Sequence, residues 1–500
     1  MSSGPPSKPL APPARPGLRG PGVLHQRYGR RAPPSAPPAP AETGQGASPG
    51  SEVAPQQATS RQPAWATGRL VTGFICLQIG CQLALLVEAI SPLRVLIRSL
   101  AFGCSLLLLA LVPGRRLKHP AVAFLLVSMG VTALNLFHPQ ANSLMAGVTQ
   151  LGIQLAVIAP LFWVSRLRID AATFRRTLAL LFLFNAASAG VGVLQVAFPG
   201  RFQPAMSTAI EGMGESYVRS LQFETAGGTR IFRPFGLTDV PGGAATGAFY
   251  AVLLGTGFLI SARRGLVQVL SVGGIFLGIV SLYLCQVRSL ALMLGVCLLA
   301  VVLVLTLKGR LLRLTKLLAV VGGLAMLGLG WAITVGGDSV TARWSRLFES
   351  DAGSVYYSNR GYFLEGTFEY FLPKYPLGAG SGRYGMANAY FGDNSDPARS
   401  SLWVEIQWTA WVLDGGVVVM VLYPLAVLLT ALWAFRLALQ REDRSEFWLW
   451  GGIIFAYDLG ALALTFSYPF FMSQAGMEFW LLNAALFGAF AHASVHPDRR

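Results

Sequence analysis

Residues 282–291, LYLCQVRSLA, join two long apolar runs. One run begins near residue 266 and the other ends near residue 307. Each has about the 20 residues that an α-helix needs to cross the hydrocarbon core of a bilayer. The stretch therefore predicts two membrane-spanning helices joined by a tight turn, with a single arginine, Arg288, placed in that turn.

The composition extends this prediction to most of the chain. Of the 500 residues, 53% are hydrophobic and 12% are charged, and the mean hydropathy is +0.53. A soluble protein of this length needs more polar surface to cover its core, so a soluble globular class is excluded. We predict an all-α polytopic membrane protein with about 12 transmembrane helices. The predicted spans are 70–90, 94–112, 120–137, 145–164, 178–198, 243–261, 266–285, 289–307, 317–336, 404–434, 447–468 and 476–493.

Positive charge gathers in short connections between the spans. The formal net charge is +16, yet lysines and arginines cluster after even-numbered spans rather than in one basic domain. The positive-inside rule assigns such segments to the cytoplasm, so we expect both termini to be cytoplasmic and expect no nucleic-acid partner. Two long loops, about 199–242 and about 337–403, then face outward, as does the turn that holds Arg288.

The first 65 residues differ from the rest of the chain. Residues 1–65 are rich in Pro, Ala, Gly and Ser and contain no apolar segment. We predict a disordered cytoplasmic tail, followed by a transmembrane domain over 66–500. We hypothesise that the basic tail tethers partner proteins or anionic lipid. The five cysteines lie in or next to apolar spans, without the spacing of a metal site or a disulfide framework, and we expect them to serve packing.

Arginines in the outward-facing segments are the main candidates for function. They are Arg288 in the turn, Arg230 and Arg233 in the first long loop, and Arg360 in the second. Guanidinium groups bind phosphate well because they stay charged and offer paired donors. We interpret them as a site for an anionic lipid-linked ligand such as a polyprenyl diphosphate, whose departure cations assist. In the alternative interpretation, they touch lipid headgroups or pair with acidic residues of the second loop.

One carboxylate, Glu405, is the candidate general base. It lies near the start of the span at 404–434, where a partly buried carboxylate close to the arginine-bearing loop can deprotonate a sugar hydroxyl. A structural ion pair with an arginine is the alternative role. Residues 361–371 predict an amphipathic helix, which either lies at the membrane interface or packs against the spans.

Three other patterns in the outer segments predict local structure. Gly378, Gly380 and Gly382 indicate a tight turn beside a substrate groove, because the other features of a nucleotide-binding loop are absent around them. The run DNSD at 393–396 indicates a turn, since its spacing matches no calcium loop. His138, at the end of the third span, is expected to be a hydrogen-bonded helix-end histidine.

Several of these segments together resemble the bacterial O-antigen ligase and O-antigen polymerase superfamily. The resemblance covers most of the chain after the tail and rests on RPFG at 233–236, RSLA at 288–291, NR at 359–360, PLGAG at 376–380 and DG at 414–415. It implies a membrane glycosyltransferase of the GT-C type in the bacterial inner membrane, with a large periplasmic loop before helix 10. Such enzymes act on undecaprenyl-diphosphate-linked glycans without a nucleotide sugar, an obligatory metal or another cofactor.

The resemblance also implies roles for individual residues. Arg288 and either Arg230 or Arg233 would hold the diphosphate, with Arg360 as their partner from the large loop. In the ligases a histidine opens the segment that leads to the acidic-glycine pair, but here that position holds Glu405 and the large outer loop has no histidine. This departure favours an inverting polysaccharide polymerase in which Glu405 is the general base and Arg288 assists catalysis. Repeat units of an exopolysaccharide or O-antigen would be transferred en bloc.

Two alternatives stay open. An O-antigen ligase would transfer the glycan to lipid A-core or to protein. A transporter or flippase of lipid-linked sugars would carry charges or helix breaks near the middle of its spans, whereas the charged residues here gather at outer span ends and in the outer loops. The expected partners of a polymerase are the lipid-linked donor, the glycan acceptor, the bilayer, and a flippase and a chain-length regulator.

Overall fold

The computed structural model describes residues 66–114, 118–204, 215–225, 227–262, 265–349, 352–393, 395–440 and 446–495. All of them belong to one compact unit within Ser60–Arg500. Residues 1–65, for which the sequence predicts a disordered tail, lie outside the described residues.

Each of the twelve predicted spans contains an α-helix. These helices are α1 (Arg69–Ala84), α2 (Arg94–Leu111), α3 (Val122–Leu134), α4 (Leu144–Trp163), α5 (Ala171–Ala197), α8 (Ala244–Ser261), α9 (Leu266–Cys285), α10 (Arg288–Leu307), α11 (Leu311–Gly336), α17 (Gln407–Leu439), α18 (Phe447–Leu464) and α19 (Gln474–Val495). Within the described residues, nine helices are long and apolar enough to cross a membrane, and α1 and α3 are apolar but shorter. The chain is therefore a helical, multi-pass membrane protein. That all twelve helices cross the membrane stays a prediction.

Burial separates a central group of helices from a peripheral one. In the most apolar 18-residue segment of each helix, 78% of the residues of α8 and 83% of those of α18 are buried. In α2 and α11 only 11% of these residues are buried. A Cβ at Gly278 of α9 would lie 2.8 Å from the carbonyl oxygen of Ala248 in α8. This close approach through small residues is typical of packed membrane helices. The exposed apolar sides of α2 and α11 are the surfaces that we expect to face lipid.

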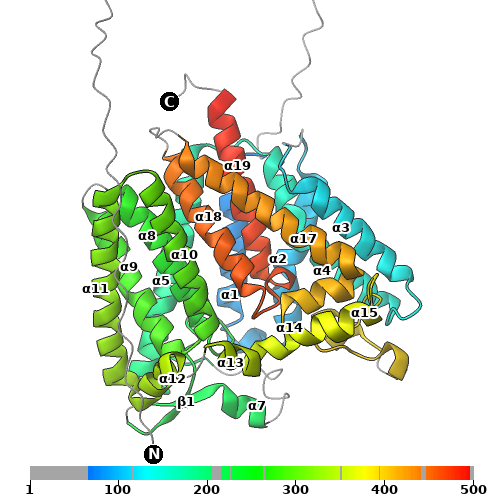
Figure 1. Ribbon diagram of the computed structural model, residues 1–500, viewed down its shortest axis with the longest axis horizontal. Coiled ribbons are helices and arrows are strands. Elements are labelled where there is room, and N and C mark those ends of the chain that lie inside the picture. Colours follow the sequence, from blue (N-terminus) through cyan, green and yellow to red (C-terminus); the bar gives the residue numbers. More distant parts are fainter. Residues whose placement is uncertain are drawn as a thin grey trace, which may run out of the picture. The chain divides into compact units, whose positions relative to one another are not determined.

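The two long connections contain short elements at one end of the bundle. The first holds α7 (Glu215–Ser220) and the antiparallel strands β1 (Gln222–Glu224) and β2 (Arg230–Phe232). The second holds α12 (Asp338–Glu349), α13 (Ala352–Tyr356), α14 (Tyr362–Gly366), α15 (Leu372–Lys374) and α16 (Gly385–Phe391), with π-helical turns at Tyr357–Gly361 and Thr367–Phe371. Short 3-10 turns occupy Glu88–Leu93, Asn135–Phe137, Val164–Arg166, Pro397–Arg399 and Phe470–Met472. In Figure 1 the elements α7, β1 and α12 to α15 lie along the lower edge, and the C-terminal end of α19 lies at the upper edge.

Two helices start well before their predicted spans: α11 begins at Leu311 rather than at residue 317, and α5 also begins early. α5 begins at Ala171 rather than at residue 178 because Asp170 caps it, and the Asp170 carboxylate accepts a hydrogen bond from the Thr173 backbone N–H at 2.6 Å. An N-cap satisfies one of the free donors of the first turn and lets a helix continue beyond its apolar part. Hydropathy alone therefore marks the membrane-length core of such a helix and not its polar first turn.

Candidate functional site

The tight turn between α9 and α10 is present as predicted. α9 ends at Cys285, Gln286 adopts a left-handed backbone conformation with φ 55°, and α10 begins at Arg288. Non-glycine residues rarely adopt this conformation. The Gln286 side chain donates a hydrogen bond to Ser339 Oγ at 3.3 Å. The turn is thereby held against the start of the large loop, and Arg288 lies half-buried at the end of the bundle that carries both long loops.

Arg233 from the first long loop lies beside this turn. Its Nη2 donates to the Ser220 carbonyl oxygen at 3.2 Å, while its buried Nε has no hydrogen-bond partner among the described residues. Burial and, to a smaller extent, the nearby charge of Arg288 lower the pKa of Arg233. Neither arginine forms an ion pair with a carboxylate of the described residues. Arg233 and Arg288, named here the cationic pair, therefore hold like charges close together.

Two contacts fix the loop that carries Arg233. Gln195 of α5 accepts hydrogen bonds from the backbone N–H groups of residues 235–236 at 2.8 and 2.9 Å. Asp239, which is 5% exposed, pairs with Arg98 of α2 at 2.5 Å. The sequence does not reveal these supports, because Gln195 and Arg98 come from helices far away along the chain. The contacts of Gln195 and Asp239 hold Arg233 at the turn without pairing its charge.

Arg230, the other candidate of this loop, is placed differently. It begins β2, is exposed, and lies opposite Glu224 in the antiparallel register. Of the two arginines that the sequence offers as partners of Arg288, the structure brings Arg233 to the turn.

Arg360 and Glu405 form an ion pair just before α17. Arg360 lies in the π-helical turn Tyr357–Gly361, and its Nη1 donates to Glu405 Oε2. The other carboxylate oxygen of Glu405 accepts a hydrogen bond from Trp403 Nε1 at 3.1 Å. The side chains of Arg360 and Glu405 are 37% and 23% exposed. The carboxylate is thus held in place from two sides and is still partly open to solvent.

The helix predicted over 361–371 exists and is part of a longer one. Residues 352–374 are continuously helical, with two π-helical turns. Thr367 is fully buried, and its Oγ1 lies 2.7 Å from Thr409 Oγ1 of α17. The helix therefore packs against a predicted span, which is one of the two placements expected for it. This packing carries Arg360 to the start of α17.

α17 is broken near its start, at Gly416. This glycine has φ +59°, and a Cβ there would lie 1.9 Å from the carbonyl oxygen of Pro376. The same oxygen accepts a hydrogen bond from the Val417 N–H at 3.0 Å. On the other side of the break, the Ala379 N–H donates to the Leu413 carbonyl oxygen at 2.9 Å. Backbone groups freed by a break in a membrane helix need partners from the protein, and here the large loop supplies them.

The predicted glycine turn is the segment that fills this break. Gly378, Gly380 and Gly382 all have positive φ, between 80° and 111°. A Cβ at Gly380 would lie 2.5 Å from the backbone nitrogen of Ala141, so the turn is pressed against the α3–α4 connection. Asn135 at the end of α3 donates to two carbonyl oxygens, one in the turn and one in α17, both at 3.1 Å. The turn is confirmed; a substrate groove beside it stays a prediction.

Asp414 is a buried carboxylate next to the same break. It is 5% exposed, and its Oδ1 accepts hydrogen bonds from Gln150 Nε2 and the Tyr384 hydroxyl, both at 2.7 Å. Burial holds the pKa of Tyr384 well above its usual value, so the hydroxyl keeps its proton and remains a donor. A small cavity beside Asp414 is also lined by Gln154. Asp414 belongs to the DG pattern, and the signal that could have singled it out is an acid within a membrane span.

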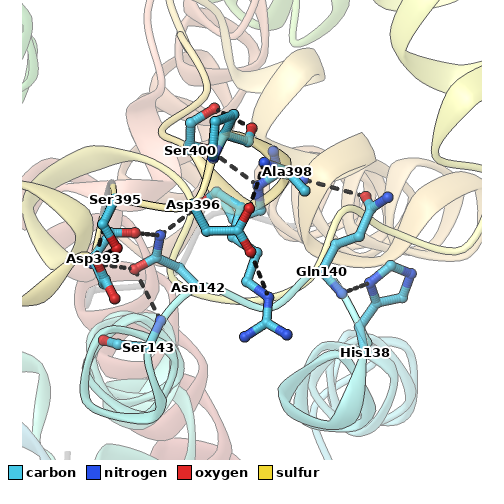
Figure 2. Close-up of polar contacts among 12 residues, drawn as sticks. His138, Gln140, Asn142, Ser143, Asp393, Ser395, Asp396, Ala398 and Ser400 are labelled. Carbon is cyan, nitrogen blue, oxygen red and sulfur yellow. Dashed lines mark hydrogen bonds and ion pairs between the residues drawn. The ribbon is translucent and has the colours of Figure 1, made fainter.

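The α3–α4 connection also holds the last part of the large loop (Figure 2). Asn142 Nδ2 donates to the backbone carbonyl oxygens of Asp393 and Arg399, both at 2.6 Å. Its Oδ1 accepts a hydrogen bond from the Asp393 N–H at 2.6 Å. The Asp396 carboxylate accepts one from the Ala398 N–H at 2.9 Å. Asn394 lies outside the described residues, and the described residues on either side of it form the expected turn. The carboxylates of Asp393 and Asp396 accept hydrogen bonds from the backbone N–H groups of Ser395 and Ala398, so they serve local structure.

His138 lies at the start of the same connection. Its Nδ1 accepts a hydrogen bond from the Gln140 N–H at 3.1 Å, which Figure 2 shows, so the expectation of a hydrogen-bonded helix-end histidine is confirmed. Partial burial and the positive charge of Arg383 lower the pKa of His138. The imidazole is therefore held neutral, which suits an acceptor at Nδ1.

Two further acidic residues lie within helices. Asp458 of α18 is 0% exposed and accepts a hydrogen bond from Asn483 Nδ2 of α19 at 2.8 Å. Glu478 of α19 interacts with Tyr250 of α8, whose hydroxyl lies 2.7 Å from that of Tyr457. The expectation that charged residues gather at outer span ends and in the loops does not hold for Asp458, nor for Asp414. The burial of Asp458 is sustained by a polar partner on a neighbouring helix, which hydropathy averaging does not detect.

Comparison with protein-family models and with curated proteins finds no match for this chain. Among the described residues, no group of three or more His, Cys, Asp or Glu side chains is arranged to hold a metal ion. The candidate site is therefore defined by its geometry. It consists of the cationic pair at the α9–α10 turn and the Arg360–Glu405 ion pair before α17, both at the end of the bundle that carries the long loops.

Proposed function

We propose that the protein is a membrane glycosyltransferase that polymerises undecaprenyl-diphosphate-linked repeat units of an exopolysaccharide or O-antigen. The observation that carries the proposal is a partly exposed carboxylate, Glu405, at the same end of the bundle as the cationic pair. Transfer from a diphosphate donor requires cations for the diphosphate and a general base for the acceptor hydroxyl. In this proposal the loop-bearing end faces the periplasm, and both termini lie on the cytoplasmic side of a bacterial inner membrane.

Each residue of the candidate site has its own role in the proposed reaction. The donor diphosphate binds Arg233 and Arg288 and draws Arg360 away from Glu405. Glu405 then takes the proton of an acceptor sugar hydroxyl as that oxygen attacks the anomeric carbon. The bond from this carbon to the diphosphate oxygen breaks, and undecaprenyl diphosphate leaves with the electron pair, stabilised by the arginines. Attack opposite to the leaving group inverts the anomeric configuration.

Replacing the base tests the proposal most directly. A general base contributes about 10²–10⁴-fold to a rate, so Glu405→Gln should reduce polymer by about that factor while outward-facing, lipid-linked single repeat units accumulate. Glu369→Gln, which changes an exposed carboxylate of the second long loop, is the matched control and should leave polymer unchanged. Normal polymer in Glu405→Gln cells with normal protein levels would remove Glu405 from the mechanism.

Arg288 provides a second test in the same cells. Arg288→Ala should abolish polymer with the same accumulated intermediate, since loss of one preorganised donor costs about 10²–10³-fold. Arg288→Lys should rescue poorly, because an ammonium group does not offer the paired donors of a guanidinium. Normal polymer in both variants would make Arg288 a headgroup anchor.

Transport of lipid-linked sugars is the second candidate function. The observations that favour it are the broken helix α17 beside Asp414 and the buried Asp458, because broken helices and intramembrane acids are common in transporters. The location of the intermediate separates the two functions. Repeat units that accumulate on the cytoplasmic face of Arg288→Ala cells would favour transport over polymerisation.

A further inference from the structure

A cavity lies at the opposite end of the bundle, where α8 ends and α11 and α18 begin. One part of its wall is apolar and the other is charged. The residues that matter for its chemistry are Leu259, Ile260 and Leu317 on the apolar part and Arg313, Lys316 and Glu446 on the charged part. The candidate site described above uses none of these residues.

The one carboxylate in this wall is already engaged. Glu446 accepts hydrogen bonds from Arg175 of α5 and from the Ser261 hydroxyl of α8 on the same oxygen, Oε2. Its backbone has φ 56°, a conformation that non-glycine residues rarely adopt. The charge of Glu446 is thus balanced by Arg175, and its side chain ties three helices together around the cavity.

The two cations in the wall have no carboxylate partner among the residues that the structure describes. Arg313 lies over the ring of Trp448, with its guanidinium carbon 5.4 Å from the ring centroid. Lys316, one turn further along α11, is exposed. In the parts of the chain that the structure describes, neither Arg313 nor Lys316 forms an ion pair. The cavity therefore carries a net positive charge next to an apolar wall.

We propose that this cavity binds a phosphate-bearing anion. Guanidinium and ammonium groups together are suited to a phosphate, and the apolar wall suits the first carbons of an acyl or glycerol moiety. Trp448 beside Arg313 is the type of residue that marks a membrane–water boundary. An anionic phospholipid headgroup matches both walls, whereas a free phosphate matches only the charged one. This site is independent of the proposed glycosyltransferase activity.

Native mass spectrometry of the full chain tests the site. The protein is released from nanodiscs that contain equal amounts of phosphatidylglycerol and phosphatidylcholine, and the retained lipids are counted. Wild type should retain phosphatidylglycerol in preference, and Arg313→Gln and Lys316→Gln should each weaken its retention roughly fivefold. Arg436→Gln removes an exposed cation near the end of α17, outside the cavity, and should change nothing.

Two further measurements distinguish a lipid phosphate from a free phosphate and control for misfolding of the variants. The exchange variant Arg313→Lys/Lys316→Arg keeps both charges and should keep the lipid. Displacement of phosphatidylglycerol by inorganic phosphate at matched concentration would identify a soluble anion as the ligand, and resistance to it would identify the lipid. Equal retention of both lipids by wild type, or unchanged retention in the folded Arg313→Gln/Lys316→Gln variant, would overturn the proposal.

Discussion

Arg360 and Arg288 lie at the same end of the bundle, but their surroundings differ. Arg360 has a carboxylate partner, Glu405, and the pair is neutral and partly exposed. Arg288 lies beside a second cation, Arg233, and no carboxylate of the described residues pairs with either. An ion pair needs no ligand, whereas half-buried like charges cost stability unless an anion binds between them. The cationic pair is therefore the stronger indication of a binding function, and the ion pair is a contact that a ligand has to open.

The largest effect that we expect concerns the break in α17, the helix that begins just after Glu405. In Gly416→Ala the new methyl group would collide with the Pro376 carbonyl oxygen, and the residue would keep an unfavourable positive φ. We expect a loss of about 3 kcal/mol or more in the free energy of unfolding, measured by denaturation in mixed micelles. Gly385 also has a positive φ, but a Cβ there would meet no atom within 4 Å. Gly385→Ala should cost only about 1 kcal/mol, and an equal loss in both variants would contradict the packing at the break.

The next largest effect concerns anion binding, which should depend on Arg288 and not on Arg230. Inorganic diphosphate at one hundred times its dissociation constant should stabilise the protein by about 2.7 kcal/mol, seen as a rise in Tm. The effect should disappear in Arg288→Gln and persist in Arg230→Gln, because Arg230 is exposed and lies opposite Glu224 in the strand pair. All three proteins should carry Arg313→Gln and Lys316→Gln, so that the cavity at the other end does not contribute. A Tm shift that survives Arg288→Gln would place the anion elsewhere.

Single substitutions should then change stability in opposite directions. Without ligand, Arg288→Gln removes repulsion from Arg233 and should raise the free energy of unfolding by up to about 1 kcal/mol. Arg360→Gln removes attraction to Glu405 and should lower it by a similar amount or less, since the pair is partly exposed and screened by solvent. Both differences should shrink at high salt. Destabilisation by Arg288→Gln would show that its charge is compensated.

The smallest effect concerns pH and the connection that holds the large loop. The pKa of His138 is lowered from its usual 6.5 in the folded protein, so the unfolded chain binds the proton more readily. Stability from this group is complete above pH 6.5 and is lost as the pH falls below it. Because His138 is only partly buried, the loss should stay below about 1 kcal/mol. His138→Asn keeps an acceptor for the Gln140 N–H and should remove this part of the pH dependence, measured as Tm between pH 7.5 and about 5.

The elements of the fold could be predicted from the sequence, but the pairing of side chains could not. Hydropathy places the helices because membrane helices must be apolar over a fixed length, and the turns at Arg288 and at the glycines follow from local chemistry. The partner of Arg360 depends on how the helix 352–374 packs on α17. The choice of Arg233 over Arg230 depends on Gln195 and on where β2 ends. Such contacts join residues distant in the chain, and no local pattern encodes them.

The break in α17 also governs how the chain can be assembled in the membrane. Synthesis runs from the N-terminus, so Asn135 and the turn after Pro376 are already made when residues 407–439 emerge. Their donors and acceptors are ready to satisfy the open backbone at Gly416 as α17 enters the bilayer. A rearranged gene that encoded α17 first would send an unsatisfied helix break into lipid. The order of the segments along the chain is thus part of what makes the broken helix insertable.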